Sequence, residues 1–154
     1  LAQRLDVEVR RAHRYGQPLS VVLIDVDRLK DINDRFGHDV GDDALRRIGA
    51  AISGGCRATD VAGRWGGDEF LVLAPSTPIA DARLLGDRIR HSVNELRGTL
   101  PLSVSVGIAS AVAGVLLTSS RRLLRAADDA LYAAKRGGRD QVAVEDGGGR
   151  SSTG

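Results

Sequence analysis

This sequence is poor in the features that mark extracellular or membrane proteins. It contains one cysteine, Cys56, so no disulfide can form within the chain, and a reducing cytosol is the expected environment. No apolar run approaches the roughly 20 residues that span a bilayer, and no signal peptide opens the chain. We therefore expect a cytoplasmic segment, by itself or as the cytoplasmic part of a larger, membrane-bound protein.

Neither sign of charge dominates, and lysine is nearly absent. A formal net charge of +2 gives no reason to expect a nucleic-acid polymer or a membrane surface as partner. Of 22 basic residues, 20 are arginine, and the two lysines are Lys30 and Lys135. A compact ammonium meets a phosphate as a point charge, which a planar guanidinium does not replace. Both lysines are therefore candidates for phosphate contacts, and chance survival under a compositional bias is the alternative.

The remaining composition, 42% apolar and 27% charged over 154 residues, predicts one globular domain. Hydrophobic spacing predicts helices over residues 1–15, through 40–52, and over 78–96 and 120–135. Strands are predicted over residues 19–27, 60–64, 69–74 and 100–110, and a short strand over 140–144 is predicted at the edge of the sheet. Lys30 is expected in a loop, and residues 147–154 are expected to form a disordered tail. Gly66 and Gly67 predict a type I′ hairpin turn. This order is typical of an α+β fold with one mainly antiparallel sheet surrounded by helices.

The stretch GRWGGDEFLVLA puts Asp68 and Glu69 at the mouth of a buried strand, and Asp25 ends an earlier one. If these strands are neighbours, Asp25 and Asp68 share one rim of the sheet, where two uncompensated carboxylates would repel. A divalent cation resolves this repulsion, and magnesium favours one or two carboxylates together with phosphate oxygens. The pattern therefore indicates a nucleoside triphosphate with magnesium and two-metal phosphoryl transfer. The alternative is that both acids are solvated residues at strand ends.

Four blocks of the sequence together resemble the GGDEF family, the diguanylate cyclases. They are IDVDRLKDINDRFGHDVGDDAL, RATDVAGRWGGDEFLVLAP, LSVSVGIA and ADDALYAAKRGGRDQV, which agree with the family in order and spacing. The resemblance implies a fold like that of the nucleotidyl cyclases and the polymerase palm, over residues 1–146. The family's usual first stretch, DxLTGLxNR, is missing, so we expect a domain truncated at its N-terminus.

The resemblance also implies an activity, the condensation of two GTP into cyclic di-GMP with release of two pyrophosphates. Each subunit of a homodimer would hold one GTP, with the active site between the subunits. Asp25, Asp68 and the backbone carbonyl of Val26 would ligate Mg²⁺ or Mn²⁺, and Asp68 would take the proton of the attacking 3′-hydroxyl. Glu69 belongs to the motif but receives no role.

The substrate contacts implied by the resemblance divide into guanine and phosphate contacts. Asn33 and Asp42 match the positions that contact guanine, whose N1–H and 2-amino group suit a carboxylate. Asp42 has an alternative interpretation as the N-cap of the next helix. A larger group would contact phosphate: the backbone amides of Arg28 and Leu29, and the side chains of Lys30, Lys135 and Arg139. The family often has aromatic residues in the loop that contains Arg28 and Leu29, and this chain has none there. For Lys135 and Arg139 the alternative is compensation of a helix dipole.

A further motif, RATD over residues 57–60, matches the family's inhibitory RxxD site. The resemblance implies that Arg57 and Asp60 bind the cyclic di-GMP product, and that Arg88 corresponds to an arginine contributed by a second subunit. A local surface ion pair is the alternative for Arg57 and Asp60. An upstream sensor or dimerising domain is a further expected partner.

Three functions remain open on the sequence alone. The first is an active diguanylate cyclase, and the second is a GGDEF-like module that binds GTP or cyclic di-GMP without catalysis. The third is a palm-type cyclase acting on ATP. The presence of Asp25, Asp68 and Glu69 favours catalysis, and Asn33 with Asp42 disfavours ATP.

Overall fold

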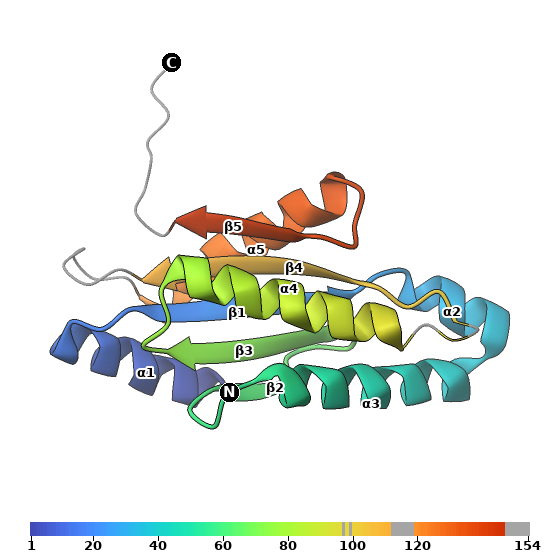
Figure 1. Cartoon of the computed structure of the whole chain (residues 1–154), viewed down its shortest axis with the longest axis horizontal. Coiled ribbons are helices and arrows are strands. Elements are labelled where there is room, and N and C mark those ends of the chain that lie inside the picture. Colours follow the sequence, from blue (N-terminus) through green and yellow to red (C-terminus); the bar gives the residue numbers. More distant parts are fainter. Residues whose placement is uncertain (97, 99, 112–118, 147–154) are drawn as a thin grey trace, which may run out of the picture.

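The computed structural model describes residues 1–96, 98, 100–111 and 119–146. Ten elements follow one another along the chain (Figure 1): α1 (Ala2–Tyr15), β1 (Leu19–Val26), α2 (Leu29–Phe36), α3 (His38–Gly55), β2 (Val61–Arg64), β3 (Glu69–Pro75), α4 (Ile79–Glu95), β4 (Val104–Ala111), α5 (Ser120–Arg136) and β5 (Val142–Asp146). The predicted tail over 147–154 lies outside the described residues.

One five-stranded sheet in the order β2-β3-β1-β4-β5 organises the fold. Strand β1 lies at its centre and pairs antiparallel with both β3 and β4, whereas the edge strand β5 runs parallel to β4. All eight residues of β1 are buried, including Ser20 and Asp25, as in a strand covered on both faces. The prediction of a mainly antiparallel α+β sheet is confirmed.

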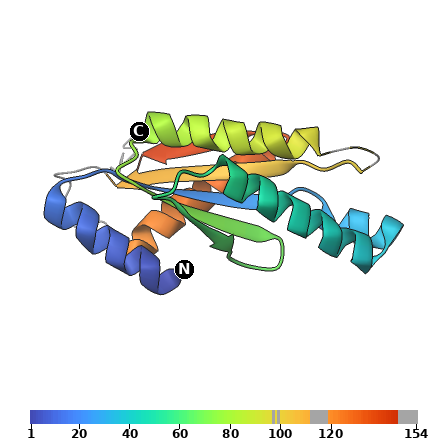
Figure 2. The ribbon, with the colours of Figure 1, turned by 60° about the horizontal axis from the view of Figure 1, so that its bottom comes forward.

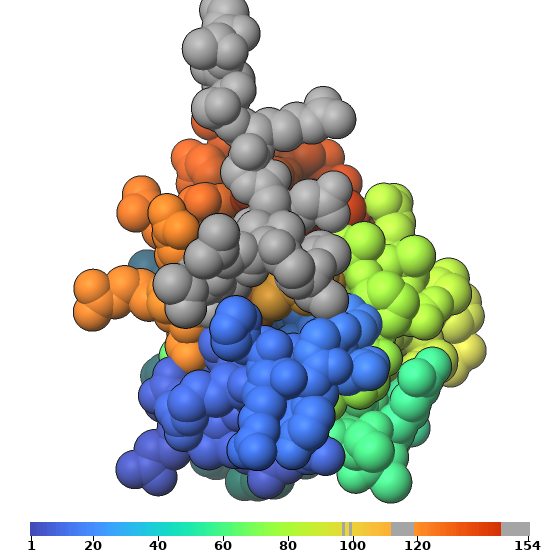
Figure 3. Space-filling model, turned by 90° about the vertical axis from the view of Figure 1, so that its left-hand side faces the viewer, coloured from blue at the N-terminus to red at the C-terminus, as the bar shows by residue number. Residues whose placement is uncertain are grey.

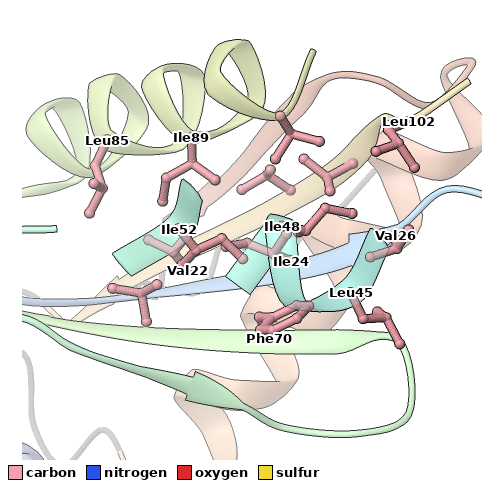
Figure 4. Close-up of a cluster of buried hydrophobic side chains, with 14 of the residues drawn as sticks. Val22, Ile24, Val26, Leu45, Ile48, Ile52, Phe70, Leu85, Ile89 and Leu102 are labelled. Carbon is pink, nitrogen blue, oxygen red and sulfur yellow. The ribbon is translucent and has the colours of Figure 1, made fainter. Parts of the chain in front are cut away.

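Helices cover both faces of this sheet. Helices α2, α3 and α4 pack on the face formed by Val22, Ile24 and Val26, with Ile48, Ile52 and Ile89 in the same cluster (Figure 4). Helices α1 and α5 pack on the opposite face, and Figure 2 shows these two helices on the far side of the sheet from α4. Figure 3 shows the molecule from one end of the sheet, with α1 (blue) at the bottom, α5 (orange) on the left and α4 (yellow-green) on the right.

Two glycines are needed by this architecture. Gly16 ends α1 with φ at 62°, a left-handed conformation that favours glycine, and so closes the helix predicted over residues 1–15. Gly107 lets β4 approach α5 closely, because a Cβ there would lie 2.2 Å from the carbonyl oxygen of Ala127. The face of α5 that carries Lys135 is therefore held directly against the sheet.

Two local predictions were wrong. Residues 29–36 form a helix, α2, so Lys30 lies in a first helical turn and not in a loop. The hairpin turn is not type I′, because neither Gly66 nor Gly67 has a positive φ. The turn is wider: the carbonyl of Glu69 accepts the N–H groups of both Trp65 and Gly66, at 2.8 and 3.2 Å. The side chain of Arg64 closes it by donating to the carbonyls of Gly66 and Gly67.

Within the described ranges, no helix is both long enough and apolar enough to cross a bilayer.

Candidate active site

Asp25, Asp68 and Glu69 lie at one end of β1 and β3. Asp25 is paired in register with Glu69, so their side chains leave the same face of the sheet. Asp68 directly precedes β3, and its carbonyl oxygen accepts the N–H of Val26 at 3.0 Å. β1 and the hairpin strand β3 are neighbours, which is the condition that a shared rim requires, and their pairing brings residues 43 positions apart in the chain to one rim.

Asp25 is the most buried of these acids, with 6% of its surface exposed. Burial is the main cause that raises its pKa, and the charges of Asp68 and Asp27 add to the increase. Lys135 opposes the increase, because its Nζ lies 2.7 Å from Asp25 Oδ2. Burial also raises the pKa of Glu69, and the charges of Asp25 and Asp68 raise it further. The carboxylates therefore form one electrostatically coupled group.

This group fits a cation that is shared with a substrate. Among the described residues, no three acidic, histidine or cysteine side chains are close enough to hold a metal ion by themselves. Two carboxylates and a backbone carbonyl are nevertheless hard oxygen donors, and magnesium takes few protein ligands when phosphate oxygens complete its shell. Burial is the larger cause of the raised pKa of Asp25 and Glu69, and the mutual repulsion that adds to it is the feature that a cation would relieve.

The predicted phosphate contacts lie around the same rim. Lys135 is in the last turn of α5, but its amine pairs with Asp25, so dipole compensation is not its main interaction. Arg139 follows α5 in a loop and is exposed. Arg28 caps α2 with φ at 53°, and the N–H groups of the first turn after it have no helical partner, as at sites that bind anions. Lys30 is exposed in that turn.

The two predicted guanine contacts lie on α2 and α3, which pack together through a glycine. A Cβ on Gly41 would lie 1.7 Å from Asn33 Oδ1, so only glycine leaves room for this amide. Within the described part of the chain, Asn33 Oδ1 is buried without a hydrogen-bond partner. Asp42, next to Gly41, is exposed inside α3, which begins at His38. The N-cap interpretation of Asp42 is therefore wrong.

The residues of the predicted inhibitory site line one pocket of about 70 Å³, together with Thr77, Asp81, Leu84 and Leu85. Asp60 Oδ2 accepts a hydrogen bond from the backbone N–H of Arg57 at 2.7 Å. The guanidinium of Arg57 is not the donor in this bond, so Asp60 does not hold it. Asp60 Oδ1 is buried and has no partner among the described residues. Arg88 reaches the same pocket from α4 and donates to the carbonyl of Gly55 at 2.9 Å. Burial and the charge of Asp60 raise the pKa of the neighbouring Cys56 thiol to about 11.

Sequence reasoning missed several residues of this region. A pocket of about 280 Å³ adjoins Glu69 on the α5 face, with Trp65, Arg125 and Asp128 in its lining. The charge of Asp128 contributes to the raised pKa of Glu69. Asp27 is buried two positions from Asp25 and accepts three hydrogen bonds. Its hydrogen-bond partners lie 76 or more positions away in the chain, so no local sequence pattern indicates them.

The chain is similar to proteins of one family. Residues 1–141 match the family described as "Diguanylate cyclase, GGDEF domain". Response regulator PleD of Caulobacter vibrioides is 42% identical over 146 residues, which cover 90% of this chain and 32% of PleD. Diguanylate cyclase DosC of Escherichia coli K12 is 35% identical over 138 residues, or 88% of this chain and 30% of DosC. The chain thus spans about a third of the length of these relatives.

A solved structure agrees in fold as well. The GGDEF domain of DgcB from Caulobacter crescentus, in complex with c-di-GMP, superposes with a TM-score of 0.84 at 30% identity, covering 92% of this chain and 86% of that one. The shared sheet, the acids at the rim of β1 and β3 and the match over residues 1–141 lead to one conclusion. The chain belongs to the GGDEF family, that of the diguanylate cyclase domains.

Proposed function

We propose that this domain is a diguanylate cyclase that condenses two GTP into cyclic di-GMP and two pyrophosphates. The observation that carries the proposal is the convergence of Asp25, Asp68 and Lys135 at one rim of the sheet. An ammonium 2.7 Å from a buried carboxylate marks the point where a triphosphate and its cation would both be held. Because one chain supplies one such half-site, two chains facing each other form the catalytic unit.

Each residue has a role in this proposal. Asp25 and Asp68, with the carbonyl of Val26, hold Mg²⁺ or Mn²⁺, which supplies neutralisation of the triphosphate charge when bound. Lys135 and Arg139 bind the phosphates, with Lys30 and the amides of Arg28 and Leu29 beside them. Asp68 accepts the proton of the attacking 3′-hydroxyl, and its position beside the bound substrate compensates for the weak basicity of a carboxylate.

Guanine selectivity is assigned to Asn33 and Asp42. Asn33 Oδ1 has no hydrogen-bond partner among the described residues, and a guanine N–H would satisfy this acceptor once the amide turns toward the base; leaving such an oxygen unpaired costs about 1–3 kcal/mol. Asp42 would accept from the N1–H and the 2-amino group. Adenine presents no such pair of donors on one edge, so ATP would leave both oxygens unsatisfied.

The test is turnover by the chain fused to a dimerising coiled coil. GTP with magnesium should give cyclic di-GMP and pyrophosphate in a one-to-two ratio, whereas ATP should give no product. Asp68→Asn should retain GTP binding and lose about 10²–10⁴-fold in rate, since it removes the proton acceptor and a charge. Asp129→Asn removes the same charge from an exposed position of α5 and should match wild type. GTP binding without any pyrophosphate would instead establish a non-catalytic module.

Product inhibition at the pocket of Arg57, Asp60 and Arg88 belongs to the same proposal. Asp60 Oδ1 has no partner among the described residues and would accept a guanine N–H once the side chain turns into the pocket, and the two arginines would donate to phosphate. Calorimetric titration with cyclic di-GMP should show binding to wild type and at least tenfold weaker binding to Asp60→Asn. Asp129→Asn again serves as the charge-matched control. Equal affinity of all three proteins would remove this site from the proposal.

A further inference from the structure

The loop that follows α5 contains two consecutive residues in the left-handed conformation. Arg139 has φ at 63° and Asp140 has φ at 46°, although neither is glycine. Such backbone is unfavourable for side chains with a Cβ, and it persists only where the surroundings impose it. The N–H of Arg139 returns to the carbonyl of Ala134 at 3.1 Å, which ends the helix but does not hold Asp140.

The first support for this conformation is Asp27, whose residue surface is 5% exposed. Its Oδ2 accepts the backbone N–H of Asp140 at 3.1 Å and the hydroxyl of Ser103 at 2.7 Å. Its Oδ1 accepts the hydroxyl of Ser105 at 2.6 Å. Its own N–H donates to the carbonyl of Ser103 at 2.9 Å. Asp27 thereby joins the end of β1, the start of β4 and the loop after α5.

The second support comes from α4. Arg90 Nη1 lies 3.2 Å from Asp140 Oδ1 and 3.4 Å from the carbonyl oxygen of Asp140. Asn94 Nδ2 donates to the same Oδ1 at 3.1 Å. Asp140 is therefore held from the sheet by Asp27 through its backbone N–H, and from the helix by Arg90 and Asn94, mainly through its side chain.

We propose that Asp27 and Asp140 are positioning residues, which fix the strained backbone of Arg139 so that its guanidinium meets the triphosphate. This inference rests on the proposed function. Without either support the loop relaxes to unstrained conformations, and Arg139 spends only a fraction of its time in the competent one. Apparent affinity falls in proportion to that fraction, so a competent population of one in ten weakens triphosphate binding about tenfold.

The decisive experiment is a double-mutant cycle on the 154-residue chain, titrated with a non-hydrolysable GTP analogue and, separately, with GMP. Asp27→Ala removes both acceptor oxygens, including the one that accepts the Asp140 N–H. It should weaken binding of the GTP analogue about tenfold and change GMP affinity less than twofold, because GMP lacks the outer phosphates. In an Arg139→Ala background, Asp27→Ala should have no further effect, since the residue that Asp27 positions is gone.

Asp140 provides the conservative control and a second route should Asp27→Ala fold poorly. Asp140→Asn keeps a side-chain oxygen for Arg90 and should bind the analogue within twofold of wild type. Asp140→Ala removes that oxygen and should weaken binding about tenfold; its side chain is 33% exposed, so folding should survive. Additive losses in the cycle, or equal losses for GMP and the analogue, would overturn the positioning role. Failure of the wild type to bind the analogue would overturn the proposed function itself.

Discussion

The ion pair between Lys135 and Asp25 makes a quantitative prediction about stability. In Lys135→Ala the buried carboxylate of Asp25 loses its hydrogen-bonded cation, while the repulsion from Asp68 remains. A hydrogen bond to a charged group contributes about 1.5–3 kcal/mol. The Lys135 side chain is 34% exposed, so water screens the pair and replaces part of the interaction. We therefore expect the free energy of unfolding to fall by about 1–2 kcal/mol at pH 7.5.

This loss should depend on pH in a defined direction. The pKa of Asp25 in the folded protein is raised above its ordinary value of 3.8, so its ionisation opposes folding as the pH rises through the folded pKa. Lys135 limits that opposition, and its removal raises the pKa of Asp25 further. Below about pH 3.8 Asp25 is protonated in both folded and unfolded states, and the variant should then match wild type. The difference should grow above that pH and become constant near neutrality.

Urea denaturation in the presence of EDTA measures this effect without a competing cation. The double variant Asp25→Asn/Lys135→Ala should be no less stable than Asp25→Asn alone, because the lysine has no carboxylate left to neutralise. Arg136→Ala, which removes the adjacent cation and its contact with the Tyr132 ring, should cost less than about 1 kcal/mol at every pH. A loss in Lys135→Ala that is independent of pH, or that persists fully in the Asp25→Asn background, would refute the reasoning.

Other substitutions test the remaining parts of the structure. Gly41→Ala should displace the amide of Asn33, because the new Cβ would lie 1.7 Å from Asn33 Oδ1. Calorimetry should then show at least tenfold weaker binding of GTP and an unchanged affinity for inorganic pyrophosphate. Cys56 should react slowly with a thiol reagent at pH 7.5, and the reaction rate should rise about tenfold for each pH unit up to about pH 11. Asp60→Asn should increase the rate at fixed pH, because loss of the Asp60 charge lowers the pKa of the thiol. Gly107→Ala should lower the free energy of unfolding by about 1–3 kcal/mol in urea denaturation, because its Cβ overlaps the backbone of α5.

The sheet and most of the helices were predictable because their signals are local. The apolar residues over 19–26, interrupted only by Ser20 and Asp25, predicted a strand, and the structure buries all eight residues of β1. Helix α2 was missed because only eight residues form it. Its apolar positions, Leu29, Ile32 and Phe36, have helical spacing but are too few to be distinguished from a loop. The glycine pair misled the turn prediction, since glycine permits a positive φ without requiring it.

The site was predictable to the extent that its residues lie in recognisable motifs. Asp25 and Asp68 each occupy a distinctive strand end, so their meeting followed from one assumption about strand order. The ion pair of Asp25 with Lys135 joins residues 110 positions apart, and sequence spacing carries no information about it. The same holds for Asp27, whose contact with Asp140 spans 113 positions. Long-range polar contacts are decided by the packing of α5 against the sheet, which is a property of the folded chain.

Backbone strain is a further marker of function in this chain, and the residue types alone do not reveal it. Four described non-glycine residues have a positive φ, and three of them, Arg28, Arg139 and Asp140, belong to the two loops expected to contact phosphate. Each costs on the order of 1–3 kcal/mol relative to an unstrained residue, so the fold sacrifices stability at these two loops, as it also does at Ser76. Glycine at position 140 would remove the strain but also the carboxylate that Arg90 contacts. Stability and positioning therefore favour different residues there, and the Asp140 that this chain carries is the one that positions Arg139.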